Sequence, residues 1–308
     1  MKRILIDTDP GVDDAHAILM ALAHPNVEVV AITTVNGNVG VDKTTANALK
    51  ILDVANKDIP VFAGCSKPLV SEPYHASYVH GKDGLGDCGI PPSQRTVQTE
   101  HAVQALIQLS KEHAGELSLV TIGPLTNVAV AMQLDPDLPK RFEKLVIMAG
   151  AIYAKGNTKM CAEFNVYADP EAAQIVLDGW GKLSMLSWET TVAHAIGPAD
   201  LDHLLSLGTP KAEFIGKTNQ KFLELTKSRL GGQRKLFAPD ALAVAAAMEP
   251  EIVIKAEEHY VAVELSGQLT RGLTVVDWSN TSQKPANVEI ILEVNQQRFL
   301  ELMEDALR

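Results

Sequence analysis

Short apolar runs alternate with segments of helical periodicity over the first two-thirds of the chain, and this pattern restricts the fold more than any other feature. Strands are expected at residues 2–6, 27–33, 59–63, 117–122, 144–148 and 182–186. Helices are expected between them, at residues 13–23, 44–55, 101–113, 125–132 and 170–177. Because parallel strands need crossover connections of this kind, the sequence predicts an α/β fold: an open, mostly parallel central sheet flanked by helices.

The last third of the chain adds further elements to this pattern. Helices are expected at residues 210–229, 239–248 and 297–307, and strands at residues 260–265, 273–277 and 288–294. Residues 74–92 are rich in Gly, His and Pro and are expected to form a long loop, and long loops in compact domains are often functional. Because no linker or repeat interrupts the chain, residues 1–308 are predicted to form a single domain.

The composition is ordinary for a globular protein and excludes several classes. Of the 308 residues, 46% are hydrophobic, which is enough for a sizeable core. The formal net charge of −11 opposes binding to nucleic acids or anionic membranes, because both need clustered Lys and Arg. The three cysteines (Cys65, Cys88 and Cys161) are odd in number and form no C-x-x-C pair, and no apolar stretch has the length of a signal or membrane segment. We therefore expect a cytoplasmic protein.

Four carboxylates fall within eight residues directly after the first predicted strand: Asp7, Asp9, Asp13 and Asp14. In open α/β sheets, ligands bind at this end of the strands. Carboxylates crowded so closely repel one another, and a divalent cation would relieve the repulsion. Helix capping explains one Asp here but not four. Ligands that are all oxygen favour Ca²⁺ or Mg²⁺ over zinc, so the motif predicts a site for a hard cation.

Two other classes of protein also fit this motif. An apolar strand followed by D-x-D opens the haloacid-dehalogenase-type phosphotransferases, in which Asp7 would be the nucleophile and Asp9 the acid/base. That interpretation leaves Asp13 and Asp14 without a role. The second alternative is a non-catalytic, calcium-dependent protein that binds a pentose or a nucleoside.

With further motifs along the chain, the sequence resembles the inosine-uridine nucleoside hydrolase family. The motifs that match, in order, are Asp7-Thr8-Asp9-Pro10-Gly11-Val12-Asp13-Asp14, Thr33-Thr34-Val35-Asn36-Gly37-Asn38, His80-Gly81, Gly123-Pro124-Leu125-Thr126-Asn127, Gly156-Asn157, Ala162-Glu163-Phe164-Asn165, Asp169-Pro170-Glu171-Ala172-Ala173 and the late Asp240 segment. Together they span nearly the whole chain.

The resemblance implies calcium-dependent hydrolysis of the N-glycosidic bond of ribonucleosides to free base and ribose. It assigns Ca²⁺ to Asp9, Asp14, Asp240 and the backbone carbonyl of Ile122, with Asp9 also acting as general base on a calcium-bound water. His80 would lie near the base and is a candidate acid, and Asp7 would support the site. A homodimer or homotetramer is expected. The residues expected to bind the ribose hydroxyls are Asp13, Asn38, Asn157, Glu163 and Asn165.

Taken one at a time, several of these residues also fit purely structural roles. Asn38, beside Gly37, fits an ordinary turn. Glu163 and Asn165 flank Phe164 as in a solvated strand edge. Asp240 fits the cap of a helix. Cys161 is more typical of a small buried hydrophobe than of a pocket residue.

The sequence departs from the family at the position before Asp240. Well-known members carry a His there, which is the usual candidate for protonating the leaving base, whereas this chain has Pro239. The leaving-group acid and the preference between purines and pyrimidines are therefore open. We expect His80 to take over, or stacking on an aromatic residue such as Tyr78, Tyr153 or Trp188.

Overall fold

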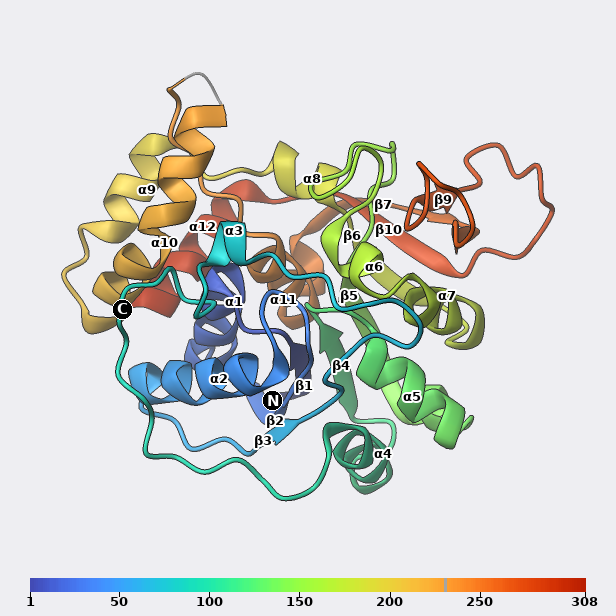
Figure 1. The fold of residues 1–308 in the computed structure, drawn as a ribbon, viewed down its shortest axis with the longest axis horizontal. Coiled ribbons are helices and arrows are strands. Elements are labelled where there is room, and N and C mark those ends of the chain that lie inside the picture. Colours follow the sequence, from blue (N-terminus) through green and yellow to red (C-terminus); the bar gives the residue numbers. More distant parts are fainter. Residues whose placement is uncertain (230–231) are drawn as a thin grey trace.

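A single large sheet forms the centre of the protein, shown in a computed structural model that describes residues 1–229 and 232–308 (Figure 1). Its strands lie in the order β3-β2-β1-β4-β5-β6-β10-β7. All neighbouring pairs are parallel except the last, in which β7 runs antiparallel to β10. The strand bounds are β1 Lys2–Thr8, β2 Val27–Thr34, β3 Val61–Ala63, β4 Leu117–Thr121, β5 Phe142–Met148, β6 Leu183–Leu186, β7 Val253–His259 and β10 Val288–Val294. The predicted fold class is confirmed.

Helices cover both faces of the sheet and divide the hydrophobic core in two. Ile4 and Ile6 of β1 point to one face, while Leu5 points to the other, as the alternation of a strand requires. The first face is covered by α1 Val12–Ala23, α2 Val41–Ala55, α10 Pro210–Arg229, α11 Pro239–Met248 and α12 Gln296–Leu307. The second face is covered by α4 Ala102–Glu112, α5 Thr126–Leu134 and α7 Pro170–Gly179.

Helix α11 is buried along its whole length, from Pro239 to Met248. It is rich in Ala, and these small side chains let it lie closely between α1 and the sheet, where it contacts both α1 and β5 (Figure 1). The packing brings residues near position 240 to the N-terminal end of α1. The first and last helices of the chain therefore lie together on one face of the sheet, because α12 also packs against α1.

Several short elements were not predicted from the sequence. They are the helices α3 Ser77–His80, α6 Phe164–Ala168, α8 Trp188–Ala193 and α9 Pro198–Leu205, together with the edge strand β7. The expected loop at residues 74–92 therefore contains one helical turn, α3. The strands expected at residues 260–265 and 273–277 are shorter and form a separate hairpin, β8 Val261–Val263 with β9 Thr274–Val276, which packs against α7.

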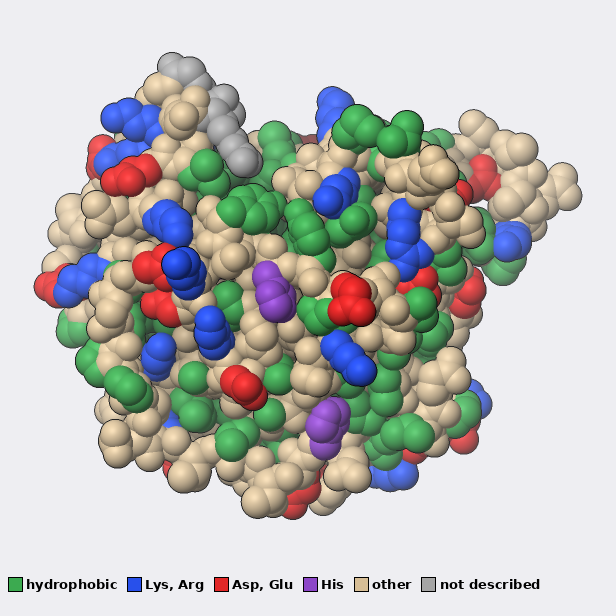
Figure 2. Space-filling view, in the orientation of Figure 1, with side chains coloured by type: hydrophobic (Ala, Val, Ile, Leu, Met, Phe, Trp, Pro, Cys, Tyr) green, Lys and Arg blue, Asp and Glu red, His purple; other side chains and the backbone are tan. Residues whose placement is uncertain are grey.

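The surface carries both signs of charge. On the face shown in Figure 2, Lys and Arg side chains are scattered among acidic and apolar ones instead of forming one continuous patch, in keeping with the net charge of −11. Of the helices in the described ranges, none combines the length and the apolar composition needed to cross a bilayer.

Candidate active site

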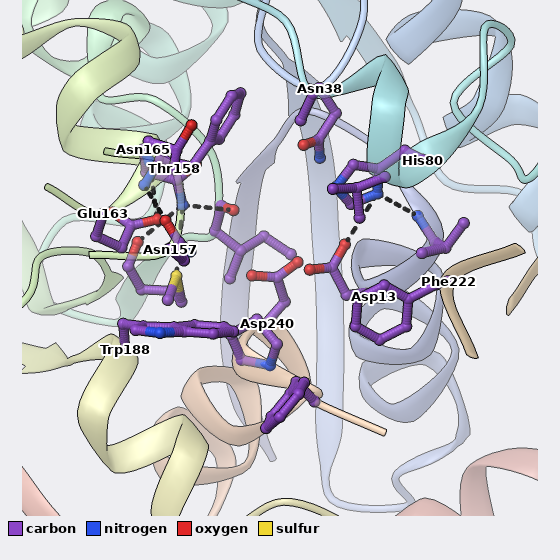
Figure 3. Close-up of a pocket in the computed structure, with 18 of the residues that line it drawn as sticks. Asp13, Asn38, His80, Asn157, Thr158, Glu163, Asn165, Trp188, Phe222 and Asp240 are labelled. Atoms are coloured by element: carbon purple, nitrogen blue, oxygen red, sulfur yellow. Dashed lines mark hydrogen bonds and ion pairs between the residues drawn. The ribbon is translucent and has the colours of Figure 1, made fainter. Parts of the chain in front are cut away.

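The carboxyl ends of the parallel strands open into a cavity of about 380 Å³. The segments after β1, β2, β4 and β5 reach it, since parallel strands end at the same edge of a sheet. Figure 3 shows Asn157, Thr158, Glu163 and Asn165 on one side, facing Asp13 and His80 on the other, with Asp240 between them. Most of the residues predicted to form a site therefore meet here. Those that line the cavity are Asp13, Asn38, His80, Ile122, Asn157, Glu163, Asn165 and Asp240.

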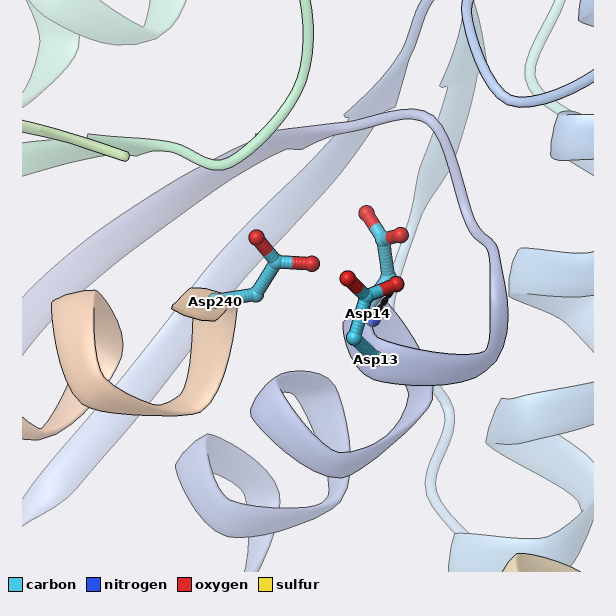
Figure 4. A group of neighbouring side chains, drawn as sticks. All are labelled: Asp13, Asp14 and Asp240. Carbon is cyan, nitrogen blue, oxygen red and sulfur yellow. Dashed lines mark hydrogen bonds between the residues drawn. The ribbon is translucent and has the colours of Figure 1, made fainter. Parts of the chain in front are cut away.

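Three carboxylates from two distant parts of the chain meet beside this cavity. Asp13 and Asp14 lie in the first turn of α1, and Asp240 lies in the first turn of α11 (Figure 4). Each offers an oxygen within 4.8 Å of the others. The N-cap of α11 is Ala238, and Asp240 lies in the first turn, so the interpretation that Asp240 only caps the helix is wrong.

Asp9 lies next to this group and is fully buried. Its Oδ2 accepts a hydrogen bond of 2.6 Å from the backbone N–H of Asn38. Its Oδ1 is buried and has no hydrogen-bond partner among the described residues. A buried, unpaired carboxylate oxygen is costly, so this atom indicates a missing ligand.

Two glycines leave the space that the Asp9 side chain fills. A Cβ atom at Gly37 would lie 2.0 Å from Oδ2 of Asp9, and one at Gly123 would lie 2.7 Å from Oδ1. No side chain fits at either position without displacing the carboxylate. The glycines of the T-T-V-x-G-N and G-P-L-T-N motifs therefore act together on Asp9.

Asp14 is held by three donors from the end of β1 and the segments that follow β1 and β2. Thr8 Oγ1 donates to one carboxylate oxygen, while the Gly11 N–H (2.8 Å) and Asn38 Nδ2 (3.2 Å) donate to the other. Asn38 also donates to the backbone carbonyl of Asp9. Its side chain thus braces both carboxylates and lines the cavity, which is more than the turn-only interpretation allowed.

Burial makes the charged forms of these carboxylates unfavourable. It raises the pKa of Asp13 and of Asp14 to about 6. Burial, and then the charges of neighbouring carboxylates, hold the pKa of Asp9 and of Asp240 well above the usual range. A bound cation would lower all four pKa values by compensating the repulsion.

The opposite side of the cavity is built from a network that joins α6 to the strand ends. Glu163 is the N-cap of α6 and accepts N–H groups from Gly150 (3.0 Å), Asn165 (2.8 Å) and Val166 (3.2 Å). Burial raises its pKa. The interpretation of Glu163 as part of a solvated strand edge is therefore wrong, because it is a buried helix cap.

Two amides complete this side. Asn165 Nδ2 donates to the carbonyls of Ile122 (3.2 Å) and Met148 (3.0 Å), so both of its N–H groups are used and its Oδ1 is left for a ligand. Asn157 Oδ1 accepts the N–H of Phe164 (2.9 Å), which leaves its Nδ2 as a donor. Donors and acceptors thus lie side by side, as hydroxyl recognition needs.

His80 forms part of the opposite wall and is also buried. Its Nδ1 accepts the Val12 N–H (3.2 Å) and lies 3.6 Å from Asp13 Oδ1. Burial lowers the pKa of the ring to about 4. Since Nδ1 is an acceptor, the neutral ring carries its proton on Nε2.

Aromatic and apolar side chains line the rest of the cavity. Trp188 of α8 packs on Phe237 (centroids 5.5 Å apart), and Phe237 meets Phe222 of α10 edge-on (6.4 Å). Sequence reasoning missed Phe222 and Phe237, because single aromatic residues in a helix and a loop give no periodic signal. Tyr78 lines the cavity as expected. Tyr153 does not: its exposed ring stacks on Trp278 instead (5.3 Å).

Asp7 lies outside the cavity. It is fully buried and accepts hydrogen bonds from Thr33 Oγ1 (2.6 Å) and Asn127 Nδ2 (2.8 Å). A nucleophile must face its substrate, so this position gives no support to a phosphotransferase that uses Asp7.

The fold and the site together define an α/β protein of the enzyme type, with a cavity of small-molecule size beside a carboxylate group that could hold a metal ion. The family model for the inosine-uridine preferring nucleoside hydrolases matches residues 4–301, and the chain belongs to this family. It is therefore an N-ribosyl hydrolase, which acts on the N-glycosidic bond of ribonucleosides.

Relatives match over nearly their whole length. The inosine-uridine preferring nucleoside hydrolase of Leishmania major is 37% identical, over 99% of this chain and 97% of the relative. The pyrimidine-specific ribonucleoside hydrolase RihA of Salmonella enteritidis is 36% identical, over 99% and 98%. Among solved structures, an inosine-guanosine nucleoside hydrolase is 38% identical with a TM-score of 0.92, covering 99% of this chain and 98% of that one. The names of these relatives specify different nucleosides: inosine and uridine, pyrimidine nucleosides, and inosine and guanosine.

Proposed function

We propose that the protein is a calcium-dependent ribonucleoside hydrolase in which Asp9 is the general base toward the attacking water. One observation carries this proposal: carboxylates from positions 13, 14 and 240 converge beside a cavity that has polar side chains on one side and aromatic ones on another. The polar part fits a sugar, and the aromatic part fits a nucleobase.

The residues present fit a calcium ion. The donors are all oxygen, the carboxylate group can hold a metal, and Asp9 Oδ1 is buried without a partner in the described chain. We assign the ion to Asp9, Asp14, Asp240 and the Ile122 carbonyl. When bound, calcium supplies positive charge that compensates the carboxylates and lowers the pKa of the attacking water.

The chain's own residues perform the remaining work. Asp9, which is buried beside the carboxylate group, accepts the proton of the attacking water. The acidic surroundings stabilise the positive charge that develops on the ribose as the N-glycosidic bond breaks. Hydrogen bonds orient the ribose hydroxyls, and they are contributed by Asp13, Asn38, Asn157, Glu163 and Asn165.

The leaving base lies against the aromatic half of the cavity in this proposal. Trp188, Phe222 and Phe237 provide ring faces for stacking. Because Pro239 has no proton to give, the proton for the base comes from the imidazolium form of His80, which returns to the neutral ring as the base leaves. A buried donor with a pKa of about 4 is a stronger acid, once protonated, than an ordinary imidazole.

An assay of reducing sugar released from inosine and from uridine, with calcium or with a chelator, tests the main proposal. We expect ribose release that chelation stops, and a loss of at least about 10³-fold in kcat/KM in Asp9→Asn. Substantial activity of Asp9→Asn would contradict the assignment of the base. Phosphate release from a phosphoester would instead favour the phosphotransferase, and binding without turnover would favour a non-catalytic binding protein.

The role of His80 is tested with a leaving group that needs no acid. We expect His80→Ala to lower kcat/KM on inosine by about 10²-fold and to leave hydrolysis of p-nitrophenyl riboside largely intact. Equal losses on the two substrates would show that His80 is not the acid.

We also propose that residues 1–308 act as one catalytic domain, in the cytoplasm, as a homodimer or homotetramer. The three cysteines are free in the described structure, which suits a reducing compartment. The exposed, stacked rings of Tyr153 and Trp278 suit burial against a second subunit. Light scattering on the purified protein measures the assembly, and a monomer at working concentration would contradict it.

A further inference from the structure

The segment of residues 151–161, between β5 and α6, carries Asn157 and Thr158 into the cavity. It contains no regular helix or strand in the described structure, and side chains add to the few backbone hydrogen bonds that hold it in place. Glu189, in α8, does so with its carboxylate: Oε2 accepts the N–H of Ile152 (2.8 Å), and Oε1 accepts those of Tyr153 (2.8 Å) and Lys155 (3.3 Å). Three charge-assisted bonds to one segment fix its path.

The first turn of α8 is also hydrogen-bonded to Gly150, the residue that precedes the segment 151–161. The backbone N–H of Trp188 donates to the Gly150 carbonyl (2.9 Å), and the Gly150 N–H donates to Glu163 (3.0 Å). Trp188 lines the aromatic half of the cavity, while Glu163 lies in the polar half. A continuous set of hydrogen bonds thus joins the aromatic wall, the segment 151–161 and the cap of α6.

The C-terminal part of the segment, from Gly156 to Lys159, is held by a separate set of contacts. A Cβ atom at Gly156 would lie 2.1 Å from the Lys159 carbonyl, so the turn there is tight. Thr158 Oγ1 bonds to Tyr74 Oη (3.2 Å), and the ammonium group of Lys159 lies over the rings of Tyr74 (4.6 Å) and Tyr167 (4.9 Å). Asn157 lies between these contacts and those of Glu189, and its own Oδ1 accepts the Phe164 N–H (2.9 Å).

We propose that Glu189 is a positioning residue that holds Asn157 and Thr158 against the bound ribonucleoside and couples them to Trp188. Glu189 does not line the cavity and acts only through the segment 151–161. The inference rests on the proposed function, because it concerns how that same site grips its substrate.

A double-mutant cycle tests this coupling. We expect Glu189→Ala to lower kcat/KM on inosine by about 10- to 100-fold, since displacement of a contact by about 1 Å has effects of this size. We expect Asn157→Ala to have little further effect in that background, because both changes remove the same contact. Fully additive losses would overturn the inference.

A conservative variant separates positioning from a general loss of structure. Glu189→Gln keeps Oε1, which accepts two of the three N–H groups, and should recover much of the activity. Calcium affinity of Glu189→Ala, measured by calorimetry, should remain that of the wild type, because the carboxylates of α1 and α11 are untouched. Hydrogen exchange at Ile152, Tyr153 and Lys155 should accelerate; unchanged exchange would overturn the inference.

Asp135 provides a matched control. It is also a carboxylate that organises a turn, accepting the Asp137 N–H (3.3 Å), but it follows the C-terminal end of α5, at the opposite edge of the sheet. We expect Asp135→Ala to leave kcat/KM unchanged. Wild-type protein that released no ribose would contradict the proposed function and the inference together. Active wild type with equally active Glu189→Ala would overturn the inference alone.

Discussion

Asp9 shows how little freedom a single side chain has in this site. One of its oxygens is fixed by the Asn38 N–H, and the other faces no protein partner among the described residues. Gly37 and Gly123 surround the carboxylate so closely that a methyl group on either would collide with it. The two glycines therefore matter for the position of this carboxylate more than for the flexibility of the loops.

Gly37→Ala should inactivate the enzyme without unfolding it. The added Cβ would lie 2.0 Å from Asp9 Oδ2 and must displace the carboxylate, so we expect kcat/KM to fall by about 10²-fold or more. Gly40→Ala is the matched control, because a Cβ there meets only open space among the described residues. The measurement is kcat/KM, with circular dichroism to verify folding. Equal activity of the two variants would refute the contact.

At the scale of elements, the sequence predicted most of the sheet and the acidic motif of the site. The first six strands and their crossover helices were found because apolar runs and helical periodicity are strong signals. Strand β7 was missed because Lys255, Glu257 and Glu258 break its apolar alternation, as suits an edge strand. Of the aromatic wall, Trp188 was predicted, whereas Phe222 and Phe237 were not, since they are brought together only by the packing of α10 on the core.

Three helices on one face of the sheet are joined by a single carboxylate. Glu249, the C-cap of α11, bonds to Arg298 of α12 (2.7 and 2.8 Å) and to His24, the C-cap of α1 (3.0 Å). These partners, Arg298 first, lower the pKa of Glu249 to about 2. The stabilisation is present above the unfolded-state pKa of about 4.5 and is lost as the pH falls toward 2.

Glu249→Gln should therefore destabilise the protein at neutral pH by about 1–2 kcal/mol, because the charge-assisted bonds become neutral ones. Urea unfolding at pH 7 and at pH 3.5 measures the effect, and the gap between variant and wild type should narrow at the lower pH. Glu251→Gln, at an exposed neighbouring position, serves as the control and should match wild type. A gap that widens as the pH falls would refute this account.

At the scale of the whole molecule, the acidic site works against the stability of the metal-free protein. Burial and mutual repulsion disfavour the charged forms of Asp9, Asp13, Asp14 and Asp240. The surrounding core of large buried side chains, which continues through α1 and α11, compensates for this cost. Calcium should thus stabilise the folded chain as well as the reaction.

We expect calcium to raise the thermal unfolding midpoint of the chelated protein. At about a hundred times its dissociation constant, a ligand of the folded state adds about 2.7 kcal/mol, which amounts to several degrees for a chain of this size. Differential scanning fluorimetry measures the shift. Asp240→Asn, which removes one carboxylate from the group, should reduce it strongly. If calcium raised the midpoint of Asp240→Asn as much as that of the wild type, the ion would bind at another site.

The packing of α11 against α1 also has a consequence for synthesis in the cell. A ribosome releases Asp14 early and Asp240 only after more than two-thirds of the chain has been made. The carboxylates at positions 13 and 14 are consequently without Asp240 for most of translation, and the group is complete only once α11 has been made.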